Sequence, residues 1–213
     1  MFKIDEDLAE DVGIHIGDGS MNFYSGIGCY TVACHWIDDK EYIDSYVSKL
    51  IEKIYGIKPK LRIWSKGTYG FRIYSKDVVN FKSQVLNLPL GPKKNIKIPE
   101  IICKDERLLK SCLRGLIDTD GCLYLEKKYG KLYPRIIFTN TSKPLVFQVK
   151  NCLEKFGFTV SLQVRNHDNK NWNITYILCT RGFNNLKLWM RLVGFSNPKN
   201  IMKINLLKER KYF

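Results

Sequence analysis

Hydrophobic residues recur along the first half of the chain with two different periods. Residues 20–36 are rich in Tyr, Ile, Val and Cys and are interrupted by glycines, which is typical of a β-hairpin. Apolar residues then follow helical spacing over 42–54, and a glycine after them ends the predicted helix. A second hairpin with strands over 60–64 and 71–76, followed by a short helix over 78–88, completes this half.

The second half of the chain repeats these elements in the same order. The pattern predicts a hairpin over 122–140, a helix over 145–156, a longer hairpin over 159–180 and a helix over 183–193. Equivalent landmarks in the two halves are separated by 101 to 105 residues. This near-constant separation indicates an internal duplication in an α+β protein, in which each copy has the order αββαββα.

The two copies are predicted to meet in a segment that is dense in Pro, Gly and Lys. That composition, over about 89–98, is typical of a linker. We therefore expect an N-terminal repeat over 1–98 and a C-terminal repeat over 99–213. Acidic residues open the first helix of each copy, at Asp5 and Asp105, where negative charge suits the helix dipole.

The first helix of each copy carries small residues four positions apart. Gly13 and Gly17 have this spacing in the first copy, and Gly115 and Thr119 have it in the second. Small side chains one turn apart on one face allow two helices to approach until their backbones nearly touch. We expect the two helices to pack against each other along this face.

An Asp-Gly pair follows the small residues in both copies. Asp18 and Asp120 should therefore emerge together at one end of the helix pair, while Gly19 and Gly121 suit the left-handed residue that ends a helix. Two carboxylates at helix C-termini are unfavourable unless a cation lies beside them. The arrangement predicts a divalent-metal site at these helix ends.

Two other polar residues of these helices are not expected to be catalytic. Asp118 points to a different side of its helix from Asp120, and its counterpart in the first copy is Ile16. A calcium loop is excluded because its first ligand position would fall on Leu116. His15, inside the first helix, is predicted to be a core histidine with satisfied hydrogen bonds.

Composition limits the class of protein and its partners. The 213 residues are 45% hydrophobic, enough for a real core, and Lys plus Arg number 35 against 21 for Asp plus Glu, a formal net charge of +14. Such an excess favours polyanionic partners, because neutralising phosphates releases counterions.

Cysteine usage and hydropathy indicate where the protein works. The seven cysteines contain no C-x-x-C pair, which predicts reduced thiols rather than disulfides or zinc ligands. No apolar run approaches the ~20 residues needed to span a bilayer. We expect a soluble cytoplasmic protein without membrane contact, associated with the nucleoid if its host is prokaryotic.

The repeated motif resembles that of the LAGLIDADG homing-endonuclease family, in the form with two motif copies in one chain. Residues 113–121 follow the nine-residue motif closely. Residues 11–19 depart from it, with Asp11 in place of an apolar residue and His15 in place of an aliphatic one. The resemblance covers the whole chain, because the order of strands and helices around each motif also agrees.

The resemblance implies a fold, an activity and a metal. The fold is a saddle of two antiparallel sheets laid along double-stranded DNA. The activity is hydrolysis of both strands of a long, pseudo-palindromic site by a monomer that uses Mg²⁺, with Mn²⁺ as a substitute. Asp18 and Asp120 would bind the metal with Gly17 and Thr119 beside them, each acid serving one strand.

Hydrolysis of a phosphodiester also needs positive charge and a group that orients water. Family members similarly place a lysine after the last helix of each unit, which selects Lys94 and Lys199, although a solvated basic linker would have the same composition. Aligning 32–35 with 137–140 selects His35 and Asn140 as polar water-binding side chains at the ends of the first hairpins. A purely structural His35 is the alternative.

Strand alternation places basic, amide and aromatic side chains on one side of each sheet, where they suit base edges and phosphates. A polar outer face is normal in any soluble sheet protein, so the argument depends on all four hairpins together with the net charge. The predicted DNA-facing residues are Lys60, Arg62, Trp64, Arg72, Tyr74, Lys76, Lys131, Tyr133, Arg135, Gln163 and Arg165.

Other functions fit the sequence less well. The first alternative is a non-cleaving nucleic-acid binder on the same scaffold, an RNA maturase or a DNA-binding regulator, but an acid at both helix ends favours cleavage. A two-aspartate hydrolase of small substrates would show Asp-Thr-Gly, which is missing, and would give the positive charge no role. Since no terminal His-Asn of a splicing domain is present, we expect an intron-encoded or free-standing enzyme.

Overall fold

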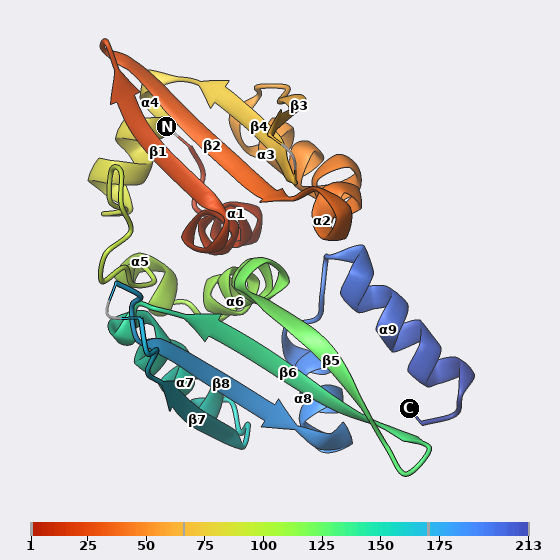
Figure 1. Cartoon of the computed structure of the whole chain (residues 1–213). Coiled ribbons are helices and arrows are strands. Elements are labelled where there is room, and N and C mark those ends of the chain that lie inside the picture. The colour runs from red at the N-terminus through yellow and green to blue at the C-terminus, as the bar shows by residue number, and fades with distance from the viewer. Residues whose placement is uncertain (1, 66, 170, 213) are drawn as a thin grey trace.

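The computed structural model describes residues 2–65, 67–169 and 171–212, and its first half has the predicted order of elements (Figure 1). These elements are α1 (Glu6–Gly17), β1 (Gly19–Tyr24), β2 (Ile27–His35), α2 (Trp36–Tyr42), η1 (Ile43–Val47), α3 (Ser48–Tyr55), β3 (Lys60–Ser65), β4 (Thr68–Tyr74), α4 (Lys76–Asn80) and η2 (Phe81–Val85). The π-helical turns η1 and η2 directly continue α2 and α4. The helix between the two hairpins of this half therefore runs without a break over 36–55. It begins six residues before the helix predicted over 42–54.

The second half repeats the order and adds two helices, one at its start and one at its end. Its elements are α5 (Glu100–Cys103), α6 (Glu106–Asp120), β5 (Gly121–Lys128), β6 (Lys131–Asn140), α7 (Lys143–Lys155), β7 (Val160–Arg165), β8 (Thr175–Arg181), α8 (Gly182–Leu192) and α9 (Pro198–Glu209). The helix α9 was not predicted, because its start resembles the linker after the first repeat. It begins at a proline, and the Asn197 side chain accepts a hydrogen bond from the Lys199 nitrogen at 3.1 Å, so a linker-like sequence starts a helix here.

Two antiparallel sheets with the same strand order flank the central helices. The first sheet has the order β1-β2-β4-β3 and the second has the order β5-β6-β8-β7. Figure 1 shows α1 and α6 side by side between the two sheets. The α+β fold with two αββαββα repeats is therefore confirmed.

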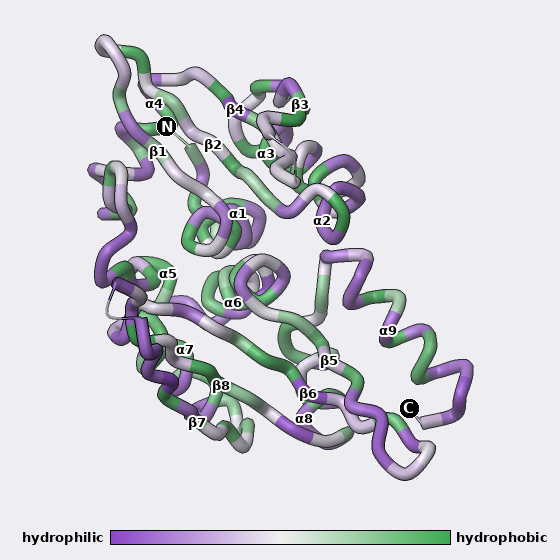
Figure 2. Tube along the Cα trace, in the orientation of Figure 1, coloured by the Kyte–Doolittle hydropathy of each residue, from purple (hydrophilic) through white to green (hydrophobic). Residues whose placement is uncertain are grey.

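One face of each sheet lies on the core. In the first sheet Val32 pairs with Phe71, and in the second Phe138 pairs with Leu178, and all four side chains are buried. Figure 2 shows that hydrophilic residues gather at the tip of the β5–β6 hairpin, far from the central helices. Alternation along the strands therefore leaves the opposite face of each sheet free for polar residues.

Side-chain caps begin the two central helices as predicted. Asp5 accepts a hydrogen bond from the Leu8 nitrogen at 3.2 Å, and Asp105 accepts one from the Arg107 nitrogen at 2.8 Å. Each cap satisfies a main-chain donor that has no partner inside its helix.

The glycines of the two Asp-Gly pairs are not left-handed, contrary to the sequence prediction. Gly121 has a φ of −128°, and Gly19 is the first residue of β1. Glycine is required at both positions because a side chain would clash with the backbone. A Cβ atom on Gly19 would lie 2.5 Å from Cα of His15, and one on Gly121 would lie 2.7 Å from the main-chain oxygen of Ile137. The chain turns from helix to strand so tightly that no side chain fits at either position.

The cysteines of the structure are free thiols. Within the part of the chain that the structure describes, no helix combines the length and the apolar composition that a membrane crossing requires.

Candidate active site

The helices α1 and α6 meet backbone to backbone along the predicted small residues. A Cβ atom on Gly13 would lie 2.1 Å from the carbonyl oxygen of Cys112, and one on Gly115 would lie 2.3 Å from that of Glu10. Neither space can hold a methyl group, because contacts this short are strongly repulsive. The predicted close contact between the two helices is confirmed.

This contact brings Asp18 and Asp120 to the same end of the helix pair. A Cβ atom on Gly17 would lie 2.0 Å from Oγ1 of Thr119 and 3.5 Å from Cγ of Asp120. Burial, followed by the neighbouring charge of Asp120, raises the pKa of Asp18 to about 7. Burial also raises the pKa of Asp120, while the charge of Lys93 acts in the opposite direction. The two acids therefore share one partly desolvated site, as the motif spacing predicts.

A lysine ammonium lies at these helix ends, and it belongs to Lys93. Its Nζ donates to carbonyl oxygens of the last turn of α1, at 2.8 Å to Ile16 and 3.2 Å to His15, and it also donates to Gly17. The prediction of Lys94 is wrong by one residue, because Lys94 is exposed and lines a groove along the linker. The partial negative charge of the α1 C-terminus is thus met by a cation from the chain itself.

Two prolines in the sequence identify Lys93, and not Lys94, as the counterpart of Lys199. Pro92 and Pro198 each follow the last helix of a repeat, and each is followed directly by a lysine. Aligning the two prolines pairs Lys93 with Lys199, whereas the alignment that selected Lys94 was shifted by one position.

Asn140, at the end of β6, contacts the acid of its own half. Its Nδ2 donates to Oδ2 of Asp120 at 2.7 Å, and its Oδ1 accepts from the main-chain nitrogen of Ser142 at 2.8 Å. The second bond fixes the orientation of the amide, so that its NH₂ group faces the carboxylate. The structure therefore places Asn140 at the site for which it was predicted.

In the first half, the strand position that corresponds to Asn140 is occupied by Cys34 and not by His35. Cys34 pairs with Tyr69 on β4, just as Asn140 pairs with Tyr176 on β8. His35 is exposed, and its Nδ1 lies 3.0 Å from a carboxylate three residues further along the chain. The alignment that paired His35 with Asn140 is wrong by one residue, a slip that moves a strand side chain to the opposite face.

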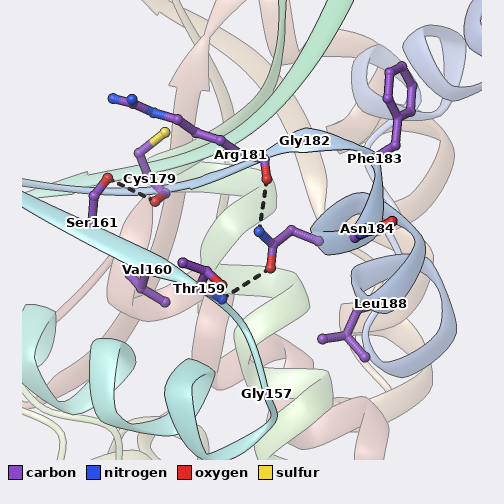
Figure 3. Close-up of a pocket in the computed structure, with 11 residues that line it drawn as sticks. Gly157, Thr159, Val160, Ser161, Cys179, Arg181, Gly182, Phe183, Asn184 and Leu188 are labelled. Atoms are coloured by element: carbon purple, nitrogen blue, oxygen red, sulfur yellow. Dashed lines mark hydrogen bonds between the residues drawn. The ribbon is translucent and has the colours of Figure 1, made fainter.

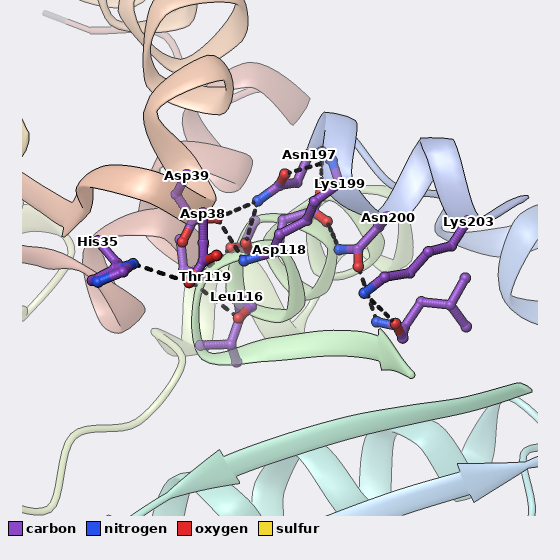
Figure 4. Close-up of polar contacts among 12 residues, drawn as sticks. His35, Asp38, Asp39, Leu116, Asp118, Thr119, Asn197, Lys199, Asn200 and Lys203 are labelled. Carbon is purple, nitrogen blue, oxygen red and sulfur yellow. Dashed lines mark hydrogen bonds and ion pairs between the residues drawn. The ribbon is translucent and has the colours of Figure 1, made fainter. Parts of the chain in front are cut away.

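A third acid, Asp39 on α2, lies near Asp18 and was not singled out from the sequence. Its Oδ1 accepts from Nζ of Lys199 at 2.5 Å and from Nδ2 of Asn197 at 2.8 Å (Figure 4). Its charge adds to the pKa rise of Asp18 and, after the larger influence of burial, to that of Cys34, which reaches about 12. Lys199 therefore reaches the site as predicted, but through a bond to Asp39.

The segment between α8 and α9 is bound to both halves beside this site. The main-chain nitrogens of Ser196 and Asn197 donate to Oδ2 of Asp118 at 2.6 and 3.0 Å, and Nδ2 of Asn200 donates to its Oδ1 at 2.8 Å. Oγ of Ser196 also donates to Glu10 on α1 at 2.7 Å. Asp118 thus anchors the start of α9 on α6.

The two residues by which α1 departs from the motif are both buried. Asp11 accepts from the Tyr30 hydroxyl at 2.7 Å and also from Tyr55 and Lys82. The His15 and Tyr30 rings lie with their centroids 5.4 Å apart. Among the described residues neither ring nitrogen of His15 has a hydrogen-bond partner, so the prediction of a satisfied histidine is wrong. Burial and the nearby Lys82 charge lower the pKa of His15 and keep its ring neutral.

The predicted DNA-facing residues of the first half share one sheet face, with one exception. The exception is Lys76, which begins α4 and does not belong to the sheet. The Trp64 ring centroid lies 5.4 Å from Cζ of Arg62 and 5.7 Å from Cζ of Arg72, so two guanidinium groups flank one indole. The residues on this face are Lys60, Arg62, Trp64, Arg72 and Tyr74.

The predicted residues of the second half also share one face, opposite the core. Register places Arg181 of β8 beside Arg135 of β6, which adds a basic residue that was not predicted. Arg135 forms an ion pair with Glu126 on the same face. The predicted residues on this face are Lys131, Tyr133, Arg135, Gln163 and Arg165.

A cavity of about 600 Å³ lies beside Arg181, where β7 and β8 meet the start of α8 (Figure 3). Its polar groups bond to each other. Asn185 accepts from the Thr159 nitrogen at 3.1 Å and donates to the Arg181 oxygen at 2.8 Å, and Ser161 donates to the Cys179 oxygen at 3.1 Å. The cavity is lined by no acid and belongs to the packing of α8 on the second sheet.

Comparison with known proteins agrees with this geometry. Residues 108–194 match the model of the LAGLIDADG-like domain. Over 202 residues the chain is 27% identical to the replication factor C small subunit of Methanocaldococcus jannaschii, an alignment that covers 93% of this chain and 10% of that protein. The chain thus spans about a tenth of the length of this curated relative.

Solved structures share the fold over nearly the whole chain. The homing endonuclease I-DmoI in complex with DNA and Mn superposes with a TM-score of 0.62 at 16% identity, covering 90% of this chain and 98% of that one. Full-length DUF199/WhiA from Thermatoga maritima gives a TM-score of 0.58 at 13% identity, covering 98% of this chain and 61% of that one. Together with the paired motif helices and the repeated sheet order, these similarities show that residues 108–194 form a LAGLIDADG-like domain and that the whole chain has the fold of homing endonucleases with two such repeats in one polypeptide.

Proposed function

We propose that this protein is a site-specific endonuclease that hydrolyses both strands of a double-stranded DNA target with a divalent metal ion. The observation that carries the proposal is the pairing of Asp18 and Asp120 at the end of the close helix contact. The similarity to I-DmoI, which was solved with DNA and Mn, supports the class of substrate and of metal. Since both halves lie in one chain and have diverged, a monomer and an asymmetric target are expected.

The residues at the helix ends fit a hard divalent cation. Asp18 and Asp120 offer carboxylate oxygens, with the main-chain oxygens of Gly17 and Thr119 beside them, and such donors are preferred by Mg²⁺ and Mn²⁺. This helix end already attracts the ammonium of Lys93. Across the described ranges no group of three or more His, Cys, Asp or Glu side chains is arranged to hold a metal. Phosphate oxygens and water would therefore complete the coordination.

Each part of the site has a role in phosphodiester hydrolysis. In this reaction a water oxygen bonds to phosphorus, the bond from phosphorus to one ester oxygen breaks, and that oxygen takes up a proton. The metal, when bound, activates the water and stabilises the developing charge. Asp18 and Asp120 would hold the cation, Asn140 fixes the Asp120 carboxylate, and Lys93 adds an ammonium group at the same helix ends.

The two polar sheet faces supply the DNA-binding surface. Basic and aromatic side chains cover the free face of both sheets, and the chain carries a net charge of +14. Lysines and arginines neutralise phosphates and release counterions, and side chains from strands reach base edges in the major groove. A protein that acts on chromosomal DNA would work in the cytoplasm, at the nucleoid of a prokaryotic host.

The test is a cleavage selection on randomised duplex DNA, followed by cleavage of the selected target. We expect defined fragments with Mg²⁺ or Mn²⁺ and none with EDTA. Asp18→Asn and Asp120→Asn should abolish double-strand cleavage and leave DNA affinity, measured with Ca²⁺, within about threefold, because neither acid grips the duplex. The exposed acid Asp38 provides the matched control, since Asp38→Asn should cleave normally.

The alternative is a nucleic-acid binder on the same scaffold that does not cleave, either an RNA maturase or a DNA-binding regulator. Tight binding without fragments under any divalent metal would favour a DNA-binding regulator, and a preference for structured RNA would favour a maturase. Full cleavage by either Asn variant would show that the two acids are assigned wrongly.

A further inference from the structure

A groove runs along the linker between the two repeats, and neither the paired acids nor the sheet faces line it. It has a volume of about 670 Å³ and extends from the end of η2 to α5. Figure 1 shows the linker between these helices at the margin of the molecule, outside the two sheets. A ligand in this groove would therefore leave both sheet faces open.

One edge of the linker is bonded to α7. The Gln148 side chain accepts a hydrogen bond from the Ile98 nitrogen at 2.8 Å and donates one to the Ile98 oxygen at 3.1 Å, as a neighbouring strand would. Oγ of Ser142 donates to the oxygen of Ile96 at 2.8 Å. Ile96 and Ile98 are buried and Lys97 is exposed, which is the alternation of an extended strand. The linker thus resembles an edge strand that α7 holds in place.

The other edge of this segment is open to a partner. Main-chain groups of successive residues in an extended segment point to opposite edges, so those of Lys97 point away from α7. Among the described residues, no group bonds the main-chain nitrogen or oxygen of Lys97. An exposed edge with free N–H and C=O groups can bind an extended peptide as a further strand.

The charged side chains around the groove favour an acidic partner. The described residues that line it include one acid, Glu100, and three lysines, Lys94, Lys97 and Lys104. The Glu100 carboxylate lies 3.9 Å from Nζ of Lys104, and both side chains are exposed, so this pair is weak. Carboxylates of a bound peptide would therefore meet an excess of positive charge.

The uncharged side chains favour a peptide over a nucleic acid. Val85 and Ile101 line the groove with 42% and 40% of their surface exposed. No aromatic residue occurs among the described lining residues, whereas proteins bind single-stranded nucleic acids with aromatic side chains on which bases stack. A second copy of this chain also fits poorly, because two molecules with a net charge of +14 repel each other.

We propose that the linker groove binds an extended acidic peptide of a partner protein, which pairs its main chain with Lys97. Side chains of an added strand alternate as those of the linker do. Aliphatic residues of the peptide therefore lie on the side of Ile96 and Ile98, and its carboxylates lie on the side of Lys97. Binding of this peptide requires no cleavage, so the proposed endonuclease function can fail without affecting it.

The test measures binding of a fluorescein-labelled peptide of alternating glutamate and valine, about eight residues long, by fluorescence anisotropy in about 0.15 M salt. Lys97→Glu combined with Lys104→Glu should weaken this binding at least about tenfold, because like charges then face the peptide. Lys187→Glu combined with Lys208→Glu is the matched control. It makes the same change of net charge on exposed lysines of α8 and α9 and should weaken binding less than about twofold.

Hydrogen exchange locates the peptide and tests the strand pairing. The Lys97 amide should exchange at least about tenfold more slowly in the complex with the peptide than in the free protein. Lys97→Pro removes this donor, whereas Lys97→Gln removes only the charge. The proline variant should therefore bind the peptide at least about fivefold more weakly than the glutamine variant. Circular dichroism checks that both variants are folded.

Several results would contradict a peptide site in this groove. These are an unprotected Lys97 amide in the presence of the peptide, equal losses of affinity in the two double variants, or equal affinities of the proline and glutamine variants. Tighter binding of an oligouridine RNA that protects the same amide would assign the groove to nucleic acid. Dimers that protect it would assign the groove to a second copy of the chain.

Discussion

The carboxylate of Asp11 and the ammonium of Lys82 form an ion pair in which neither side chain exposes any surface. Removing one partner leaves an uncompensated buried charge, so Asp11→Leu or Lys82→Met should each lower the free energy of unfolding by about 3–5 kcal/mol. The double variant should be more stable than either single variant, because Leu113 shows that the motif accepts leucine at the position of Asp11. Urea unfolding, followed by circular dichroism, measures the free energy of unfolding of the two single variants and the double variant. If the losses of the single variants add up in the double variant, the two groups do not form a coupled ion pair.

The contact of α1 with α6 makes a prediction about Gly13. Gly13→Ala places a methyl group 2.1 Å from a carbonyl oxygen of α6, so the helices must separate and the protein should lose about 3 kcal/mol or more of stability. Gly26→Ala is the control, because the added Cβ meets nothing within 4 Å there, although its φ of +78° costs about 1 kcal/mol. Thermal unfolding compares the two variants, and equal losses would mean that the close contact is unimportant.

The raised pKa of Asp18 predicts a pH-dependent stability. In the folded protein this pKa is about 7, above its ordinary value, so folding binds a proton between about pH 4 and 7 and stability falls as the pH rises through that range. Asp18→Asn removes this penalty and should stabilise the metal-free protein by up to about 4 kcal/mol at pH 8, with no gain at pH 3.5, where the carboxyl group is protonated in both states.

Metal ions should reverse this gain. Mn²⁺ favours the ionised carboxylate, so it should raise the melting temperature of the wild-type protein at pH 8 and have little influence on Asp18→Asn. Differential scanning calorimetry with and without Mn²⁺ provides the measurement. An Asp18→Asn variant that is less stable than the wild-type protein at pH 8 would contradict the assigned pKa shift.

Neighbouring lysines offer a matched pair of variants. Lys93→Met removes the ammonium beside the paired acids and should slow cleavage by about 10- to 100-fold, whereas exposed Lys94→Met should change it by less than about twofold. Single-turnover rates on the selected target, with DNA affinity measured in Ca²⁺, separate chemistry from binding. A larger loss in Lys94→Met would restore the original prediction from the sequence.

The short-range pattern of the sequence was enough to predict the duplication, the strands of both sheets and the helix pair. Strand alternation and helical spacing repeat within a few residues, and the small residues at Gly13 and Gly115 report the close contact directly. The two motif acids follow from the same spacing. These features depend on residues that are close together in the chain, so they can be predicted from the sequence alone.

Alignment of the two repeats reached the correct segments, but in each aligned pair it selected one residue correctly and missed the other by one position. A shift of one position selected Lys94 in place of Lys93 and His35 in place of Cys34. Matching landmarks such as glycines and turns align the two repeats only to within one or two residues, so a shift of one position is not detected from them. Strand register and the path of the linker decide which residues are equivalent, since one step along a strand moves a side chain to the other face.

By itself the sequence determined the repeated architecture and the paired acids, because these are set by periodicity and by residues close together in the chain. Only the tertiary structure decided which lysine meets the acids and what surrounds each one. Asp39 and Lys199 are 160 residues apart in sequence, and no local pattern relates them. Their contact depends on the longer helix at α2 and on the unpredicted helix α9, which the folded chain brings together at the end of the central helix pair (Figure 1).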